Sequence, residues 1–223
     1  MRRLPALVAI AFLSLARGAP ARDAQSWPDT YVGRLTAFAL IEELNGNLLA
    51  SRSATAALEA WCAGHHMASP ARIVAIVDRR ATSAASSLDR VLLAVGAIEP
   101  VNYRRVALAC GSHVLSQAEN WYVPARLTPR MNQLLTSTDT PFGRAISDLH
   151  AMRQTLSVER LWSPLPGGWE GDDTTGSIHD ARGRTLAIPA EIFRHRAVLY
   201  DARHRPIALV VETYTGEILD FPH

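Results

Sequence analysis

The chain has 223 residues, of which 48% are hydrophobic and 20% charged, the composition of a globular protein with a sizeable core. All 23 basic residues are arginine, and the missing lysine excludes Schiff-base chemistry, pyridoxal phosphate attachment and a P-loop. The two cysteines are too few for a cysteine zinc site.

Residues 1–21 have the pattern of a secretory signal peptide. Arg2 and Arg3 precede a short apolar run, and small residues at Ala19 and Ala21 supply a cleavage site; the alternative is a buried N-terminal helix. We expect an exported, periplasmic or secreted protein whose mature part, residues 22–223, is one domain without a membrane span. Removing the signal leaves 20 arginines against 21 acidic residues, a net charge of −1, so no general attraction to nucleic acid is expected.

The next segment predicts two helices and a strand. Apolar residues at helical spacing predict a helix over 30–44, which the sequence Asn-Gly-Asn at 45–47 is expected to end. Ser53 is the expected N-cap of a second helix that ends at Gly64. Residues 71–78 predict a strand.

The remainder reads mainly as strands, with two short helices among them. Runs 101–110 and 113–123 flank a Gly-Ser turn signal and predict a β-hairpin. The other expected elements are an ambiguous short helix or loop within 81–100, a helix over 128–137, a helix with Thr140 as N-cap and Pro141 at its first position, a strand over 153–162, a surface loop over 163–184, and strands over 193–201 and 206–216. This order predicts an α+β fold with one antiparallel sheet.

Histidine and cysteine give no strong site. The side chains of His65 and His66 point apart on any regular backbone, so we expect no metal site there. Cys62 and Cys110 lie in apolar contexts, typical of inert buried thiols. In an oxidising compartment they can instead form a disulfide, and the sequence leaves both alternatives open.

Charged residues inside apolar strands are more informative. Arg104 and Arg105 point to opposite faces of a sheet, so one of them enters an apolar environment, which is costly unless it meets an anion. Glu212, also in an apolar strand, either pairs with an arginine or has a functional role. These residues predict a partly buried pocket for an anionic ligand with a hydroxyl group; the alternative is that the two charges only neutralise each other.

Five segments occur in an order that resembles the chorismate pyruvate-lyase family and, more distantly, the ligand-sensing domain of GntR-type regulators: SRSATAALEAWC, YRRVALACG, LSQAENWYVP, TDTPFGR and RPIALVVETY. The resemblance covers about residues 30–220. It implies a single antiparallel sheet with helices packed on one face and helical flaps over an internal pocket. Members of that family cleave chorismate to 4-hydroxybenzoate and pyruvate without a metal or organic cofactor, so the resemblance implies none here.

The resemblance also assigns two catalytic roles. The family's carboxylate-binding arginine falls on Arg105, with Arg104 as the adjacent alternative. The family's glutamate that meets the ring hydroxyl falls on Glu212, which would assist proton transfer.

Three further ligand contacts follow from the resemblance. The flap contact falls on Phe142, so Phe142 and Gly143 are expected to close over the ligand. A family methionine is replaced by Ala54, and a second family arginine by Asn120.

The leading hypothesis from the sequence is a monomeric lyase that eliminates pyruvate from chorismate or acts on a similar cyclic carboxylate. The alternative is a non-catalytic exported binding protein for a small aromatic carboxylate, which Asn120 and the expected signal peptide favour.

Overall fold

The computed structural model describes residues 26–171 and 183–222. The expected signal peptide and part of the loop predicted over 163–184 lie outside these residues. The helices are α1 (Tyr31–Ala50), α2 (Ala54–Gly64), α3 (Ser87–Leu92), α4 (Pro129–Ser137) and α5 (Phe142–Ala145), with short 3-10 turns at Pro124–Arg126, Ser147–Leu149 and Gly216–Leu219. The strands are β1 (Ile73–Asp78), β2 (Asn102–Cys110), β3 (His113–Tyr122), β4 (Met152–Arg160), β5 (Glu191–Tyr200) and β6 (Pro206–Thr215).

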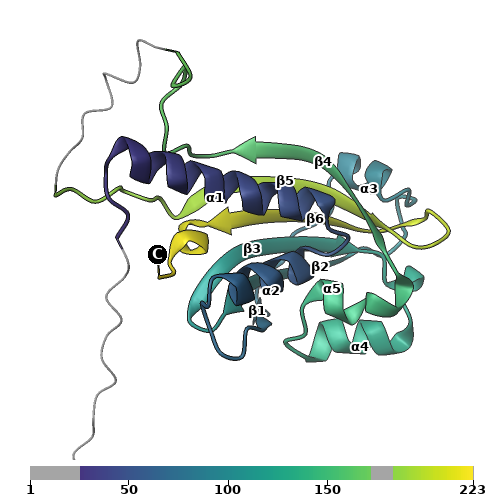
Figure 1. The fold of residues 1–223 in the computed structure, drawn as a ribbon. Helices are drawn as coiled ribbons and strands as arrows, with labels where there is room; N and C mark the ends of the chain where they lie inside the picture. The colour runs from purple at the N-terminus through teal and green to yellow at the C-terminus, as the bar shows by residue number, and fades with distance from the viewer. Residues whose placement is uncertain (1–25, 172–182, 223) are drawn as a thin grey trace, which may run out of the picture.

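The six strands form one antiparallel sheet in the order β1-β2-β3-β6-β5-β4. This confirms the α+β fold class and the hairpin predicted from the sequence. Helices α1, α2, α4 and α5 lie on one face of the sheet, and the short α3 lies behind it (Figure 1). We call the first face the covered face; it carries Val106, Ala118 and Glu212 in one cross-strand row. The other is the open face.

Helix α1 is longer than the sequence predicts. The Asn-Gly-Asn segment at 45–47 does not end it, because Leu44 and Leu48 are both fully buried against the core and hold the helix through that segment. Tertiary packing here overrides weak local helix propensity.

Within the described parts of the chain, no helix combines the length and apolar character needed to cross a bilayer.

A disulfide fastens α2 to the covered face. Ser53 caps the helix, as predicted, by accepting a hydrogen bond from the backbone N–H of Ala56. Cys62 in α2 is bonded to Cys110 in β2 across 48 residues of chain, with 6.3 Å between their Cα atoms. The two cysteines are therefore paired, which settles the alternatives that the sequence left open.

Residues 128–150, which we call the flap segment, carry α4 and α5 beside the start of β4 (Figure 1). Their apolar side chains pack on β3, β5 and β6. Helix α5 begins one residue later than predicted: Pro141 is the cap and makes no side-chain cap bond. The hydroxyl of Thr140 instead accepts a hydrogen bond from Thr138, so it does not cap the helix.

Candidate functional site

A cavity of about 380 Å³ lies between the covered face, the start of α2 and the flap segment. This volume is within the range of small-molecule sites. Its apolar walls are formed by Val106, Leu108, Ala118, Phe142, Ile146, Leu199 and Val210. The cavity can therefore enclose an apolar group of about the size of a ring, between the covered face and the helices.

A buried ion pair forms the polar part of the cavity floor. Arg153 Nη2 of β4 lies 2.6 Å from Glu212 Oε2 of β6, and the Arg153 side chain is only 3% exposed. The hydroxyl of Tyr214 donates to the same carboxylate oxygen at 3.3 Å. The Nε of Arg153 is buried and donates to no group in the described chain. A guanidinium with a spare donor beside a carboxylate suits a ligand that carries both an acidic group and a hydroxyl.

Burial and neighbouring charges shift the pKa values of the residues in and beside this floor. Burial by itself lowers the pKa of Arg153, but the Glu212 carboxylate outweighs it and holds that pKa above its ordinary value. Burial and then the Glu212 charge raise the pKa of Tyr214 well above its ordinary value, so its hydroxyl stays protonated. His195, the cross-strand neighbour of Glu212, has its pKa lowered to about 4 by burial and by Arg153. At neutral pH it is an uncharged ring hydrogen-bonded to Asn45 at 2.8 Å.

The rim of the cavity is polar and carries two further arginines. Arg144 of α5 pairs with Glu59 of α2 at 2.5 Å and donates to the carbonyl of Ile73. Arg52 also lines the cavity, next to the N-terminus of α2, where the helix dipole favours negative charge. The rim therefore adds to the attraction that the floor offers an anion.

Gly143 explains how the flap segment approaches α2. A Cβ atom placed at Gly143 would lie 2.8 Å from Ser53 Oγ and 3.1 Å from Thr55 Oγ1. The sequence suggested that this glycine permits close approach of the backbone to a ligand. The described contacts are with α2 instead, although all three residues also line the cavity.

Four of the five predicted site residues line this cavity: Ala54, Asn120, Phe142 and Glu212. Phe142 is buried and packs on Tyr122, with ring centroids 5.6 Å apart. These four residues come from segments that are far apart along the chain, and the fold brings them to one cavity.

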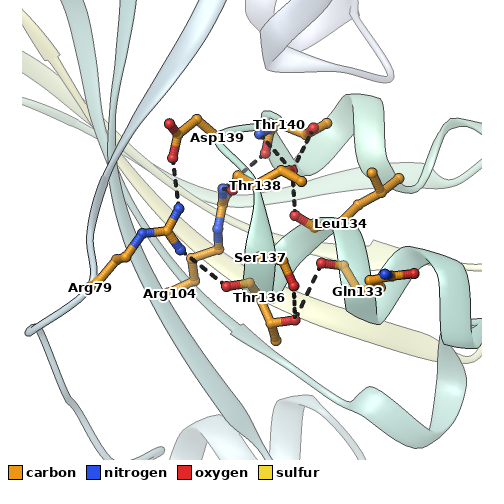
Figure 2. A network of polar contacts seen from close by, with 9 residues as sticks. All are labelled: Arg79, Arg104, Gln133, Leu134, Thr136, Ser137, Thr138, Asp139 and Thr140. Carbon is orange, nitrogen blue, oxygen red and sulfur yellow. Dashed lines mark hydrogen bonds and ion pairs between the residues drawn. The ribbon is translucent and has the colours of Figure 1, made fainter.

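The prediction for Arg105 is wrong. Arg105 is exposed on the open face, where it lines a separate groove of about 550 Å³ with charged residues of β3, β4 and β5. Arg105 and Glu212 therefore lie on opposite faces and cannot serve one ligand. The inward arginine is the adjacent alternative, Arg104, which is 5% exposed. Arg104 does not itself line the cavity; it is bound to the flap segment (Figure 2).

Arg153 is the cavity-lining, buried charged residue that the sequence analysis missed. It begins the strand predicted over 153–162, so an arginine within a strand was the available signal. Its significance depends on β4 lying two strands from β6, and nothing in the sequence specifies that strand order.

Across the residues that the structure describes, no group of three or more histidine, cysteine or acidic side chains is arranged to hold a metal ion.

A protein of similar sequence is known from a rhizobium. The uncharacterized protein y4mC of Sinorhizobium fredii (strain NBRC 101917 / NGR234) is 44% identical over 199 residues, which are 89% of this chain and 83% of that protein. No family model matches the sequence.

Solved structures with a similar arrangement include the effector domain of PhnF from Mycobacterium smegmatis. The TM-score is 0.46 at 16% identity, over 74% of this chain and 89% of that chain. A GntR-family transcriptional regulator from Bacillus cereus has a TM-score of 0.39 at 11% identity, over 68% of this chain and 96% of that chain. Both TM-scores lie below 0.5, so this likeness identifies neither a ligand nor a reaction.

Proposed function

The chain belongs to the same family as the rhizobial protein y4mC, and we propose that it binds a small cyclic or aromatic carboxylate in the cavity. The observation that carries this proposal is the buried pair of Arg153 and Glu212 on the floor of an otherwise apolar cavity. A buried ion pair contributes little net stability compared with apolar packing, so its presence favours a functional role.

The chemistry of the site matches such a ligand part by part. The apolar walls enclose the ring, and the guanidinium of Arg153 binds the carboxylate. The Glu212 carboxylate accepts a hydrogen bond from a ring hydroxyl. Phe142 covers the ring and excludes water. Arg153 thereby takes the role that the sequence analysis gave to Arg105.

Elimination of pyruvate from chorismate is the second candidate function. It is favoured by Glu212, a carboxylate inside the cavity that is hydrogen-bonded to a protonated Tyr214. In this reaction the ether C–O bond to the ring breaks and a proton leaves the neighbouring ring carbon, which gives 4-hydroxybenzoate. The departing enolpyruvate takes up a proton at its methylene carbon and becomes pyruvate. Glu212 would assist the proton transfer from the ring. The binding proposal does not require this step.

We also propose that the protein is exported and acts as a monomer. The disulfide between Cys62 and Cys110 supports export, because disulfides persist mainly in oxidising compartments. N-terminal sequencing of the mature protein tests this part: a start near Arg22 is expected, and a start at Met1 contradicts it.

The binding proposal is tested with a panel of ligands on the purified mature protein. Benzoate, 4-hydroxybenzoate and cyclohexanecarboxylate are titrated by calorimetry, with phenol as the uncharged control. We expect 4-hydroxybenzoate to bind most tightly, at one site per chain, and phenol to bind at least about tenfold more weakly because it lacks the carboxylate. Equal affinity for phenol, or no binding of any carboxylate, contradicts the proposal.

Catalysis is tested separately by incubating the protein with chorismate and measuring 4-hydroxybenzoate and pyruvate. Glu212→Gln should abolish any turnover, and Glu43→Gln, on the exposed side of α1, is the matched control that should retain it. Ligand binding without turnover in the unmodified protein would leave the binding function and exclude the lyase.

A further inference from the structure

Arg104 is a buried cation that is bound to backbone carbonyls. From β2 its Nη2 donates to the carbonyl of Thr140 at 2.9 Å and to that of Thr138 at 3.3 Å (Figure 2). In the described chain it forms no ion pair. Its Nε and Nη1 are buried and donate to no group in those residues either. Burial lowers the pKa of Arg104, the direction expected for a cation without a counter-ion.

Burying a cation in this way costs desolvation free energy that no ion pair among the described residues offsets. A guanidinium removed from water without a carboxylate partner loses more solvation than two carbonyls return. An apolar side chain of similar length would fill the space beneath the flap segment at lower cost. The two hydrogen bonds hold the backbone at Thr138 and Thr140 in place.

The carbonyls belong to the short linker between α4 and α5. This linker directly precedes Pro141, the cap of α5, and Phe142, which begins α5 and lines the cavity. Two further contacts tie it to β1 and the residue that follows: Ala75 N–H donates to the carbonyl of Asp139 at 3.3 Å, and exposed Arg79 pairs with the Asp139 carboxylate at 2.9 Å. Among these contacts, Arg104 supplies the two hydrogen bonds from a buried charged side chain.

We propose that Arg104 is a positioning residue, which fixes the linker at 138–140 and so holds Phe142 over the cavity. It does not touch the ligand; its effect on binding passes through the backbone of the flap segment. The part of the inference that concerns ligand retention rests on the proposed function. The part that concerns the flap segment stands on the contacts of Arg104 alone.

The test compares three variants of the full mature chain. Arg104→Met keeps the length and removes the donors. Arg104→Lys keeps a cation that can donate to the carbonyls. Arg105→Met alters the neighbouring arginine on the open face and is the matched control. Each is measured by amide hydrogen exchange without ligand and by urea unfolding.

In Arg104→Met we expect exchange at Arg144, Ala145 and Ile146 to rise about tenfold or more. These amides donate to the carbonyls of Pro141 and Phe142 and so report on α5. Amides of β2 and β3 should keep their protection, and the urea midpoint should stay the same or rise, because a buried cation without a counter-ion has been removed. Arg104→Lys should restore part of the protection, and Arg105→Met should change nothing.

Unchanged exchange in α5 overturns the proposal, and so does an equal loss of protection in β2 and β3, because either result makes Arg104 an ordinary core residue. 4-Hydroxybenzoate should also dissociate about tenfold faster from Arg104→Met than from the unmodified protein. Its dissociation rate from Arg105→Met should equal that from the unmodified protein. If no carboxylate binds the unmodified protein, the proposed function fails, and the exchange data still decide the role of Arg104.

Discussion

Arg104 and Arg105 are neighbours in β2, yet the two faces of the sheet give them opposite surroundings. Arg105 lies on the open face among exposed charged side chains, in a row with Glu119 of β3. Arg104 lies on the covered face, buried under the flap segment and bound to its carbonyls. Strand alternation separates the two side chains, and the helices that cover one face make the difference in burial.

The same contrast applies to the ion pairs of the two faces. On the open face, Arg194 pairs with Glu159 at 3.3 Å while both side chains remain substantially exposed. On the covered face, Arg153 pairs with Glu212 at 2.6 Å and both are nearly inaccessible. Exposed pairs contribute little to stability, whereas breaking a buried pair leaves a charge without solvent. Breaking an arginine–glutamate pair therefore has a different effect on stability on each of the two faces.

The largest expected effect comes from detaching α2 from the covered face. The Cys62→Ser, Cys110→Ser double variant should lose about 4 kcal/mol of unfolding free energy, because a 48-residue loop is no longer closed in the unfolded chain. Urea unfolding of the oxidised protein and the variant measures this. Two free thiols in the denatured, unreduced protein would show that the pair does not form.

The buried ion pair provides the next largest contrast between the faces. Glu212→Gln should lower the unfolding free energy by about 3 kcal/mol, since it leaves the Arg153 cation buried without its anion. The matched control on the open face, Glu159→Gln, should change it by less than about 0.5 kcal/mol. Comparable losses in both variants, measured by urea unfolding, would remove the distinction between the two faces.

The covered face should also be the more sensitive to acid. The pKa of His195 is lowered to about 4 in the folded protein by burial and by Arg153, against 6.5 for a free imidazole. The polar and charged groups around the ring are Asn45, Glu212, Tyr214 and Arg153. Between these two pKa values the unfolded chain binds more protons, so stability is present above pH 6.5 and falls as the pH falls toward 4.

For this one residue, the loss between pH 7 and pH 5 should be about 2 kcal/mol. His195→Gln should flatten that part of the stability profile, measured by urea unfolding at each pH. The exposed control His204→Asn should leave the slope as it is in the unmodified protein. An unchanged slope in His195→Gln would mean that folding does not lower the pKa of this ring.

The smallest effect is expected on the open face. Arg105→Ala should change the unfolding free energy by less than about 0.5 kcal/mol, because its side chain is exposed. Calorimetric affinity for 4-hydroxybenzoate should also stay the same. A marked loss of either quantity would mean that the open face contributes to the site or to the core.

Local patterns in the sequence were enough for the sheet and for much of the cavity. The turn signal between two strand-like runs predicted the hairpin, a charged residue in an apolar strand pointed to Glu212, and the family resemblance pointed to Phe142. Choosing between Arg104 and Arg105 failed, because alternation separates the two without stating which face the helices cover. Arg153 was missed for a related reason: its partner comes from the order of strands, which depends on long-range pairing.

The central claim is that the covered face binds a carboxylate through Arg153 and Glu212, and calorimetry on two variants tests it most directly. The Arg153→Met, Glu212→Met double variant removes both buried charges together, so the fold should be retained. It should bind 4-hydroxybenzoate at least about tenfold more weakly than the unmodified protein, while Arg105→Met binds with unchanged affinity. Equal affinity in the double variant and the unmodified protein would contradict the account.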